Sequence, residues 1–140
     1  MRKGFTLVEL LIVLAVIAAL MAVATPMALS AVRTAKASQV AQNLNALKSA
    51  VEQYVYSEKE LPKSEASLTN YMSKIPDKYH LNAPDDFTNG VATVVVAYAA
   101  GDISPDDVNK QYSEATKVEI TISGSKTECP GIYVKVRQWW

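Results

Sequence analysis

A continuous apolar stretch near the N-terminus constrains this chain more than any other feature. Residues 5–25 are apolar apart from two threonines and Glu9, and the cations Arg2 and Lys3 stand just before them. At a rise of about 1.5 Å per residue, a helix of this length reaches roughly 30 Å, the thickness of the hydrocarbon core of a bilayer. The stretch therefore predicts a helix that enters a membrane, with Arg2 and Lys3 on the cytoplasmic side.

Two ordinary explanations of such a stretch leave Glu9 without a purpose. A cleaved secretory signal would use Arg2 and Lys3 as its positive start and residues 22–24 (Ala-Val-Ala) as its cleavage site, and it would release a secreted binding module. A plain membrane anchor would keep the whole stretch in the bilayer. Because a carboxylate in an apolar phase is costly unless it is paired, neither explanation accounts for Glu9.

The sequence KGFTLVELLIV resembles the start of type IV prepilins and of the pseudopilins of type II secretion systems. In that family a short basic leader ends in glycine, and a membrane aspartyl peptidase cuts after the glycine and methylates the new amine. The resemblance implies cleavage between Gly4 and Phe5, N-methylation of Phe5, and a role for Glu9 in setting the register of assembly. Glu9 would pair with the Phe5 amine of its own helix, at i, i+4, or with that of a neighbouring subunit.

Helical periodicity continues beyond the apolar stretch and predicts one helix from about Phe5 to Ser57. Its second half carries an apolar stripe at intervals of three and four residues, which is typical of a helix that covers a core. The stripe comprises Val40, Leu44, Leu47, Val51 and Tyr54. Because an interior proline removes a backbone hydrogen bond and clashes with the preceding turn, Pro26 is expected to kink or weaken the helix. In filaments of the resembled family the helix at this point can be partly extended.

The rest of the chain predicts short strands, short helices and turns. An antiparallel sheet of three strands is expected over residues 91–99, 117–124 and 131–140. Short helices are expected at about 64–73 and after an N-cap at Ser104. Turns are expected within residues 77–90, around Ser123–Ser125 and at Pro130–Gly131.

The predicted fold class is α+β. A long N-terminal helix has an apolar first half that projects and a second half that packs on a small antiparallel sheet, which is the pilin fold that the resemblance implies. We expect a prepilin leader at residues 1–4 and a transmembrane and filament-core helix at 5–27. An amphipathic helix should follow at 28–57, and a globular head at 58–140.

The composition favours neither an enzyme nor a cofactor. The chain has one histidine, His80, and one cysteine, Cys129, with no glycine-rich phosphate loop, so it lacks the residues for multi-histidine metal sites and for an internal disulfide. Its 14 basic and 14 acidic residues balance, and no sequence-specific nucleic acid binding is predicted. Asp85, Asp86 and Asn89 are candidate calcium ligands, although turn chemistry explains the same residues more simply.

The C-terminal region leaves two questions. Trp139 and Trp140 either pack over the sheet edge or the long helix, or contact a neighbouring subunit. If the last strand continues to the C-terminus, Trp139 shares its outward face with Tyr133, Lys135 and Arg137. The single Cys129 means that this region cannot be locked by a disulfide as in many major pilins of animal pathogens. We expect Cys129 to be a small buried residue rather than a reactive thiol.

These features predict a bacterial filament subunit. The precursor would insert in the inner membrane and be processed by the prepilin peptidase and methyltransferase. An inner-membrane assembly platform would then polymerise it through its N-terminal helices, together with minor pilins, into an extracellular type IV pilus for adhesion, twitching motility or DNA uptake. The resemblance leaves open a pseudopilin in a periplasmic pseudopilus of a type II secretion system. A secreted binding module with an ordinary signal peptide is a more remote alternative.

Overall fold

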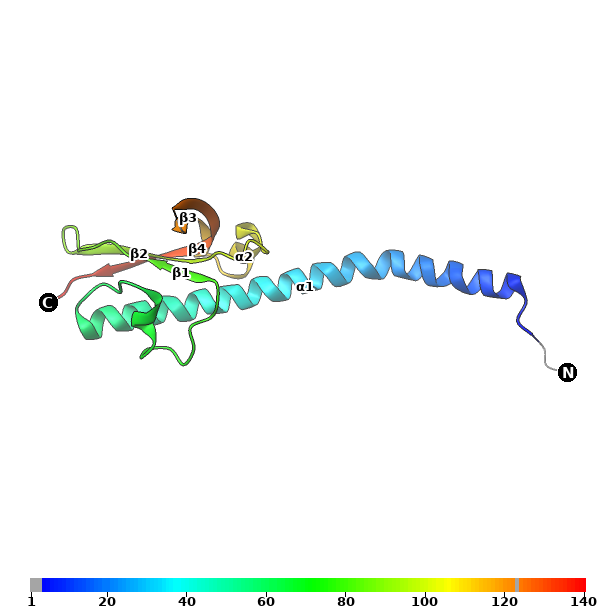
Figure 1. Cartoon of the computed structure of the whole chain (residues 1–140), viewed down its shortest axis with the longest axis horizontal. Helices are drawn as coiled ribbons and strands as arrows, with labels where there is room; N and C mark the ends of the chain where they lie inside the picture. The colour runs from blue at the N-terminus through cyan, green and yellow to red at the C-terminus, as the bar shows by residue number, and fades with distance from the viewer. Residues whose placement is uncertain (1–3, 123) are drawn as a thin grey trace. The chain divides into compact units, whose positions relative to one another are not determined.

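The computed structural model describes residues 4–122 and 124–140 and has an α+β fold (Figure 1). The elements are α1 (Leu7–Glu58), the 3₁₀ helix η1 (Glu65–Leu68), β1 (Tyr79–Asn82), β2 (Val91–Tyr98), α2 (Pro105–Gln111), β3 (Thr116–Ile122) and β4 (Ser125–Arg137). The chain divides into two compact units, residues 1–35 and 36–140, and α1 contributes to both. The predicted leader residues Met1, Arg2 and Lys3 lie outside the described residues.

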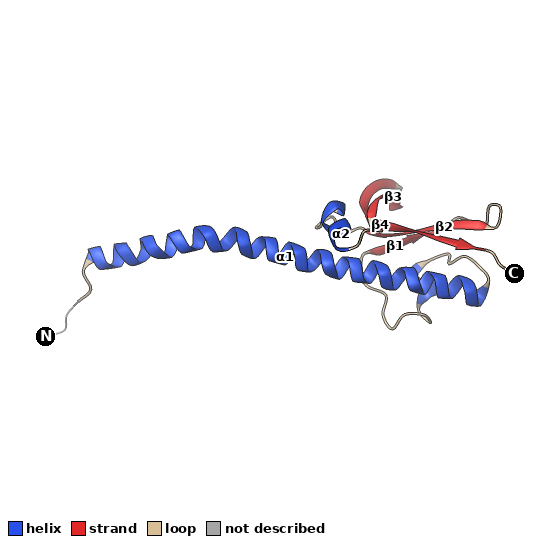
Figure 2. Ribbon diagram, turned by 180° about the vertical axis from the view of Figure 1, so that it is seen from behind, coloured by secondary structure: helices blue, strands red, loops and turns tan. Residues whose placement is uncertain are grey.

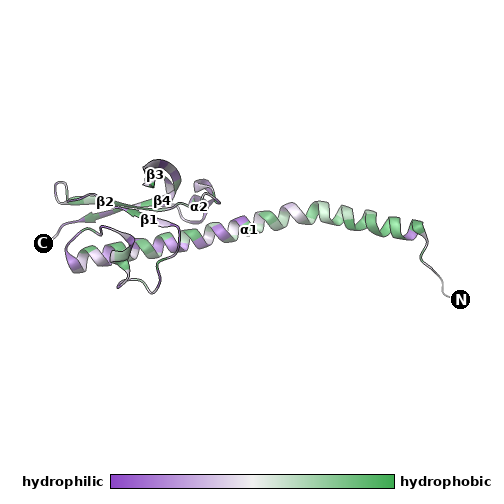
Figure 3. Cartoon of the chain, viewed as in Figure 1, coloured by the Kyte–Doolittle hydropathy of each residue, from purple (hydrophilic) through white to green (hydrophobic). Residues whose placement is uncertain are grey.

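The first unit contains the apolar half of α1, which Figure 3 shows as an almost continuous hydrophobic stretch. The single long helix is as predicted, and Pro26 lies inside it without a break. Just before the proline, the hydroxyl of Thr25 donates a hydrogen bond to the carbonyl of Met21 at 2.8 Å. The helix therefore continues through Pro26, and the kink or weakening expected there stays a prediction. The partial extension expected in a filament stays a prediction.

In the second unit, α1 buries one stripe of side chains against the sheet. The buried residues are Ala37, Val40, Ala41, Leu44, Leu47, Ala50, Val51 and Val55. They form one core with the side chains of β2 and β4 that face the helix, among them Val94, Val134 and Val136. Tyr54, predicted for this stripe, is half-buried and packs edge to face on Tyr71, with ring centroids 5.6 Å apart. The amphipathic pattern therefore predicted the helix face that covers the core.

Within the described residues the sheet has four antiparallel strands in the order β1-β2-β4-β3, one more than predicted (Figure 2). The additional strand is β1, which pairs with β2 so that Tyr79 lies opposite Tyr98. The prediction of a turn for this segment was wrong because β1 is only four residues long and lies among turn formers. Lys78, directly before it, has a φ of 68°. The hydrogen-bonded pairing with β2 stabilises this strand, and its own four residues show no strand pattern.

Strand β4 is longer than predicted and joins two ladders. Its first half pairs with β3 and its second half with β2, and Gly131 faces both Thr116 of β3 and Ala97 of β2. Pro130 and Gly131 therefore lie within a strand, and the turn predicted for them is wrong. The ladder between β2 and β4 ends at Gly131, so Pro130 has no partner on the β2 side. On that side the N–H that proline lacks costs no hydrogen bond, and proline is tolerated in the strand. The predicted turn at Ser123–Ser125 lies between β3 and β4, and Ser123 is outside the described residues.

The two short helices differ in how well they were predicted. The helix expected at 64–73 is reduced to η1, since the Ser64 side chain forms no cap hydrogen bond and only Leu68 of this turn is buried. The helix after Ser104 is confirmed as α2. The Ser104 hydroxyl accepts a hydrogen bond from the Asp106 N–H at 3.3 Å, and proline stands at the first turn.

Candidate functional site

The first turn of α1 joins Thr6 and Glu9 in a capping box. The Thr6 hydroxyl accepts a hydrogen bond from the Glu9 N–H at 3.2 Å. In return, Oε2 of Glu9 accepts from the Thr6 N–H at 2.8 Å and from the Thr6 hydroxyl at 2.8 Å. The box satisfies backbone groups that have no helical partner and places a negative charge at the positive end of the helix dipole.

Sequence reasoning identified Glu9 but missed Thr6. The signal was present, because Thr-x-x-Glu before an apolar helix is the pattern of a capping box. Among the described residues, both side-chain bonds of Glu9 reach Oε2 and none reaches Oε1. One carboxylate oxygen thus holds the helix start, and the other is open to a further donor.

The bond between Gly4 and Phe5 lies before the helix, in a segment without regular secondary structure. Phe5 is 89% exposed, and among the described residues no heavy atom other than those of its chain neighbours lies within 4 Å of where a β-carbon on Gly4 would be. A peptide bond outside a helix and open to solvent is the kind of backbone that a peptidase can bind. The structure thus places the predicted cleavage site next to the capping box and leaves it accessible.

The apolar side chains of the first unit are exposed around the whole helix. They include Leu7, Leu11, Leu14, Ile17, Leu20 and Val23. By length and composition α1 qualifies as a membrane-spanning helix, and no residue of its most apolar segment is buried within the chain. An exposed apolar surface of this extent requires a cover, which lipid or other apolar helices supply.

The chain matches the family model of the prokaryotic N-terminal methylation motif over residues 1–25, the class III leader of type IV pilins and pseudopilins. Together with the α+β arrangement of a long helix and a small antiparallel sheet, this motif supports a precursor of the type IV pilin or pseudopilin class. Comparison with curated proteins and with solved structures found no match. The motif and the apolar helix fit a bacterial precursor anchored in a membrane, and the motif implies processing by a prepilin peptidase and polymerisation.

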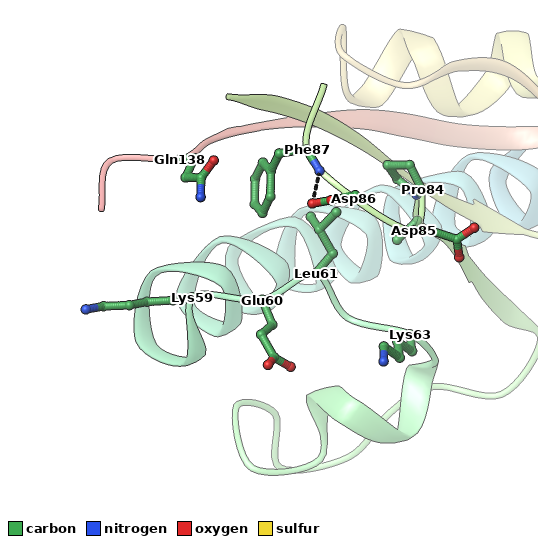
Figure 4. A pocket seen from close by; sticks show the side chains of 10 residues that line it. Lys59, Glu60, Leu61, Lys63, Pro84, Asp85, Asp86, Phe87 and Gln138 are labelled. Atoms are coloured by element: carbon green, nitrogen blue, oxygen red, sulfur yellow. Dashed lines mark hydrogen bonds between the residues drawn. The ribbon is translucent and has the colours of Figure 1, made fainter. Parts of the chain in front are cut away.

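The candidate calcium ligands belong to two different local structures. Asn89 lies in the tight turn in which Thr88 and Val91 exchange backbone hydrogen bonds of 3.0 and 3.1 Å. The φ values of Asn89 and of the glycine after it are 54° and 73°, as in a type I′ turn. Asp85 and Asp86 instead line a hollow of about 520 Å³ beside the C-terminus (Figure 4), and Asp86 accepts a hydrogen bond from the Phe87 N–H at 2.7 Å. Within residues 4–122 and 124–140, no cluster of three or more acidic, histidine or cysteine side chains could hold a metal.

The C-terminal tryptophans lie beyond β4, which ends at Arg137. The strand expected over residues 131–140 therefore ends at Arg137, so the condition under which Trp139 would share its outward face is not met. Beyond the strand, a backbone hydrogen bond runs from the Gln138 N–H to the Gly90 carbonyl at 2.8 Å. Trp140 packs edge to face on Phe87, with centroids 5.5 Å apart, and is 38% exposed. Trp139 packs edge to face on Trp140 but stays 64% exposed. One tryptophan is partly packed against the head and the other presents its ring to solvent.

Cys129 lies in a second small core with Ala97, Val118 and Ile120, apart from the core beneath α1. Its side chain is 3% exposed, and this burial raises the pKa of the thiol above its ordinary value. A thiol in this state carries little of the reactive thiolate at neutral pH. The expected role of Cys129 as a small buried residue agrees with its position.

Proposed function

We propose that this protein is the structural subunit of a type IV pilus and not an enzyme. The observation that carries the proposal is the exposed apolar surface of the first unit, which directly follows an N-terminal methylation motif. Lipid covers this surface while the precursor is anchored, and the helices of other subunits cover it in the filament. Identical subunits that pack through a heterologous, non-closing contact form a helical filament.

Glu9 sets the register of this assembly in the proposal. Cleavage between Gly4 and Phe5 creates a positively charged amine that the precursor lacks. Oε2 of Glu9 stays on Thr6, and Oε1 accepts the Phe5 amine of a neighbouring subunit. Among apolar helices such a pair is far stronger than in water, and leaving either charge unpaired is costly, so a misaligned subunit is rejected.

Two substitutions separate the cap from the charge. Glu9→Gln keeps an oxygen for the capping box, since glutamine also serves at this position, but it removes the negative charge. We expect the subunit to insert and be processed, while filaments counted by electron microscopy fall sharply, as they should for Glu9→Ala or Glu9→Val. Thr6→Ala removes the capping hydroxyl and keeps the charge, so it serves as the matched control. Filament numbers from Thr6→Ala should stay close to those of the unaltered protein.

Normal filament numbers from Glu9→Gln would contradict the proposed charge pairing. If Thr6→Ala lost its filaments while Glu9→Gln kept them, the role of Glu9 would be to cap the helix instead. Mass spectrometry of the mature N-terminus tests the processing step. N-methylated Phe5 supports the proposal, a terminus near Thr25 would show a secreted protein with an ordinary signal, and an intact Met1 would show a plain anchor.

The cellular location of the filament tests the choice of a pilus. Deletion of the gene should remove fibres from the cell surface in electron micrographs and leave protein secretion unchanged. Loss of secretion without loss of surface fibres would overturn the pilus in favour of a pseudopilus of a type II secretion system.

A further inference from the structure

The apolar surface of α1 has a charged residue at each end. Glu9 precedes it and Arg33 follows it, and the residues between them include no aspartate, glutamate, lysine or arginine. Large apolar side chains stay exposed up to the end of this segment, since Leu29 is 57% and Val32 is 64% exposed. Burial of α1 within the chain begins only after the segment. The surface that requires a cover therefore includes all of residues 10–32.

Three placements of α1 in a bilayer differ in the tilt they require and in the residues they bury. A span over residues 5–32 is roughly 42 Å long and needs a tilt of about 45° to fit a hydrocarbon core of about 30 Å, which is more than spanning helices usually have. A span over residues 5–27 is about 35 Å long, but it draws Glu9 about 6 Å into the hydrocarbon and leaves Leu29 and Val32 in water. A span over residues 10–32 has the same length, needs a tilt of about 30° and avoids both costs.

The residues at the two ends of this span suit the two surfaces of a bilayer. Glu9 is bonded to Thr6 at the helix start, so its carboxylate has partners without entering the hydrocarbon. Arg33 is exposed and forms no ion pair with any described residue, whereas the next cation, Lys36, is paired with Asp102. A guanidinium on a long stem can reach outward from the end of a spanning helix, and its planar fork of N–H groups matches a phosphate.

We propose that the anchored precursor spans the bilayer with residues 10–32 and that the Arg33 guanidinium binds lipid phosphate groups at the outer surface. This span lies closer to the C-terminus than the span of residues 5–27 that the sequence predicts. It leaves the Gly4–Phe5 bond and the Glu9 carboxylate outside the hydrocarbon, on the cytoplasmic side. The Glu9 charge then enters an apolar environment only when the subunit joins a filament. The inference rests on the anchored precursor of the proposed function and is independent of the kind of filament.

Cysteine labelling measures where the span ends. The full-length precursor is placed in phospholipid vesicles, and a maleimide that cannot cross membranes is supplied on both sides. A thiol in the hydrocarbon stays unreactive, because the thiolate is the nucleophile and does not form there. Ala28→Cys and Ala31→Cys should therefore be labelled at least about tenfold more slowly than Ala35→Cys. The unaltered protein, whose Cys129 is buried, gives the background.

The outcomes of the labelling separate this placement from the proposed function. Equal labelling at residues 28 and 35, in a chain that stays in the membrane, would overturn the placement and favour a span that ends near residue 27. Release of the unprocessed chain by alkaline carbonate would overturn the anchored precursor together with the placement. Slow labelling at residues 28 and 31 with fast labelling at residue 35 supports both.

The contact between Arg33 and phosphate has a separate test by solid-state NMR. The precursor carries arginine with an isotope-labelled guanidinium carbon, and the dipolar coupling of this carbon to lipid phosphorus is recorded in vesicles without phosphate buffer. The arginines of the chain are Arg2, Arg33 and Arg137. Because the coupling falls steeply with distance, Arg33→Gln should remove a large share of the signal, while Arg137→Gln, the matched control in the head, should leave it unchanged. A signal that Arg33→Gln does not reduce would overturn the lipid contact.

Discussion

Replacing Gly131 by alanine should destabilise the head, because β4 has no room for a side chain where its two ladders meet. A β-carbon on this residue would lie 2.4 Å from Cγ2 of Val118, 2.5 Å from the carbonyl oxygen of Val96 and 3.1 Å from Cα of Ala97. Unbonded carbon atoms prefer about 3.5–4.0 Å. The first two contacts are therefore far inside the range that packing tolerates.

The two contacts differ in how easily they yield. The methyl group of Val118 can move by a rotation of its side chain. The carbonyl oxygen of Val96 belongs to β2 and cannot retreat unless the ladder to β4 shifts. Overpacking costs about 1–3 kcal/mol, and the stiffer unfolded chain of alanine returns about 0.4–1 kcal/mol. We expect a net loss of about 1–2 kcal/mol, which lowers the melting temperature of a unit of about 100 residues by roughly 4–16 °C.

The assay is thermal unfolding followed by circular dichroism, with Gly90→Ala as the matched control. Gly90 has a φ of 73°, and within the part of the chain that the structure describes no heavy atom beyond its chain neighbours lies within 4 Å of an added β-carbon, so alanine there meets only the cost of a left-handed backbone, about 1–2 kcal/mol. Adding Val118→Ala should recover part of the loss caused by Gly131→Ala, because it removes one of the two short contacts. A melting temperature at or above that of the unaltered protein would refute the clash. An unchanged loss in the presence of Val118→Ala would refute the role of the valine methyl.

Three further predictions concern the packing and charges of the head. Leu44→Ala should lower the free energy of unfolding by about 2–5 kcal/mol in urea titrations, because this side chain is fully buried beneath the sheet. The hydrogen bond from the Lys36 ammonium, helped by the Tyr98 hydroxyl, holds the pKa of Asp102 below its ordinary value of 3.8. The ionised Asp102 therefore stabilises the folded head above that value, and this stabilisation is lost as the pH falls through the lower pKa of the folded state. Melting temperatures from neutral to acidic pH should therefore fall less steeply for Asp102→Asn than for the unaltered protein. Cys129 should react with a thiol reagent only after denaturant is added, since its sulfur is buried and its thiol pKa is raised.

The parts of the fold that sequence predicted are those whose pattern is long or chemically distinctive. The stripe of α1 repeats over five turns, and Ser104 before a proline is a strong helix start, so both were recovered. β1 was missed because four residues cannot display a period. Pro130–Gly131 was interpreted as a turn on local grounds, whereas the glycine is required by the approach of Val96 and Val118 from other strands. That approach is a property of the assembled sheet and leaves no mark in the neighbouring sequence.

The processing site and the hollow beside the C-terminus differ in the same way. Gly4, Phe5, Thr6 and Glu9 lie within six consecutive residues, so a motif contains the whole processing site, including the capping threonine that went unrecognised. The hollow at the C-terminus combines residues from three distant segments. Sequence analysis singled out its aspartates as turn residues or calcium ligands, because nothing in the linear order shows that Gln138 and Phe87 line the same hollow as Lys59. The pairing of β2 with β4 brings Gln138 close to the start of β2, and the chain just after α1 completes the hollow.

The capping box also changes what cleavage has to accomplish. A carboxylate without a partner would impose its cost on the anchored precursor, but Thr6 already satisfies Glu9 before any peptidase acts. The same bonds fix the carboxylate at the first turn of a rigid helix, so little side-chain entropy remains to be lost when the amine of another subunit arrives. Cleavage therefore supplies only the missing cation, one residue before the threonine that orients its partner. Loss of the Thr6 hydroxyl should then leave filament numbers close to those of the unaltered protein, while loss of the Glu9 charge removes the ion pair that sets the register between subunits.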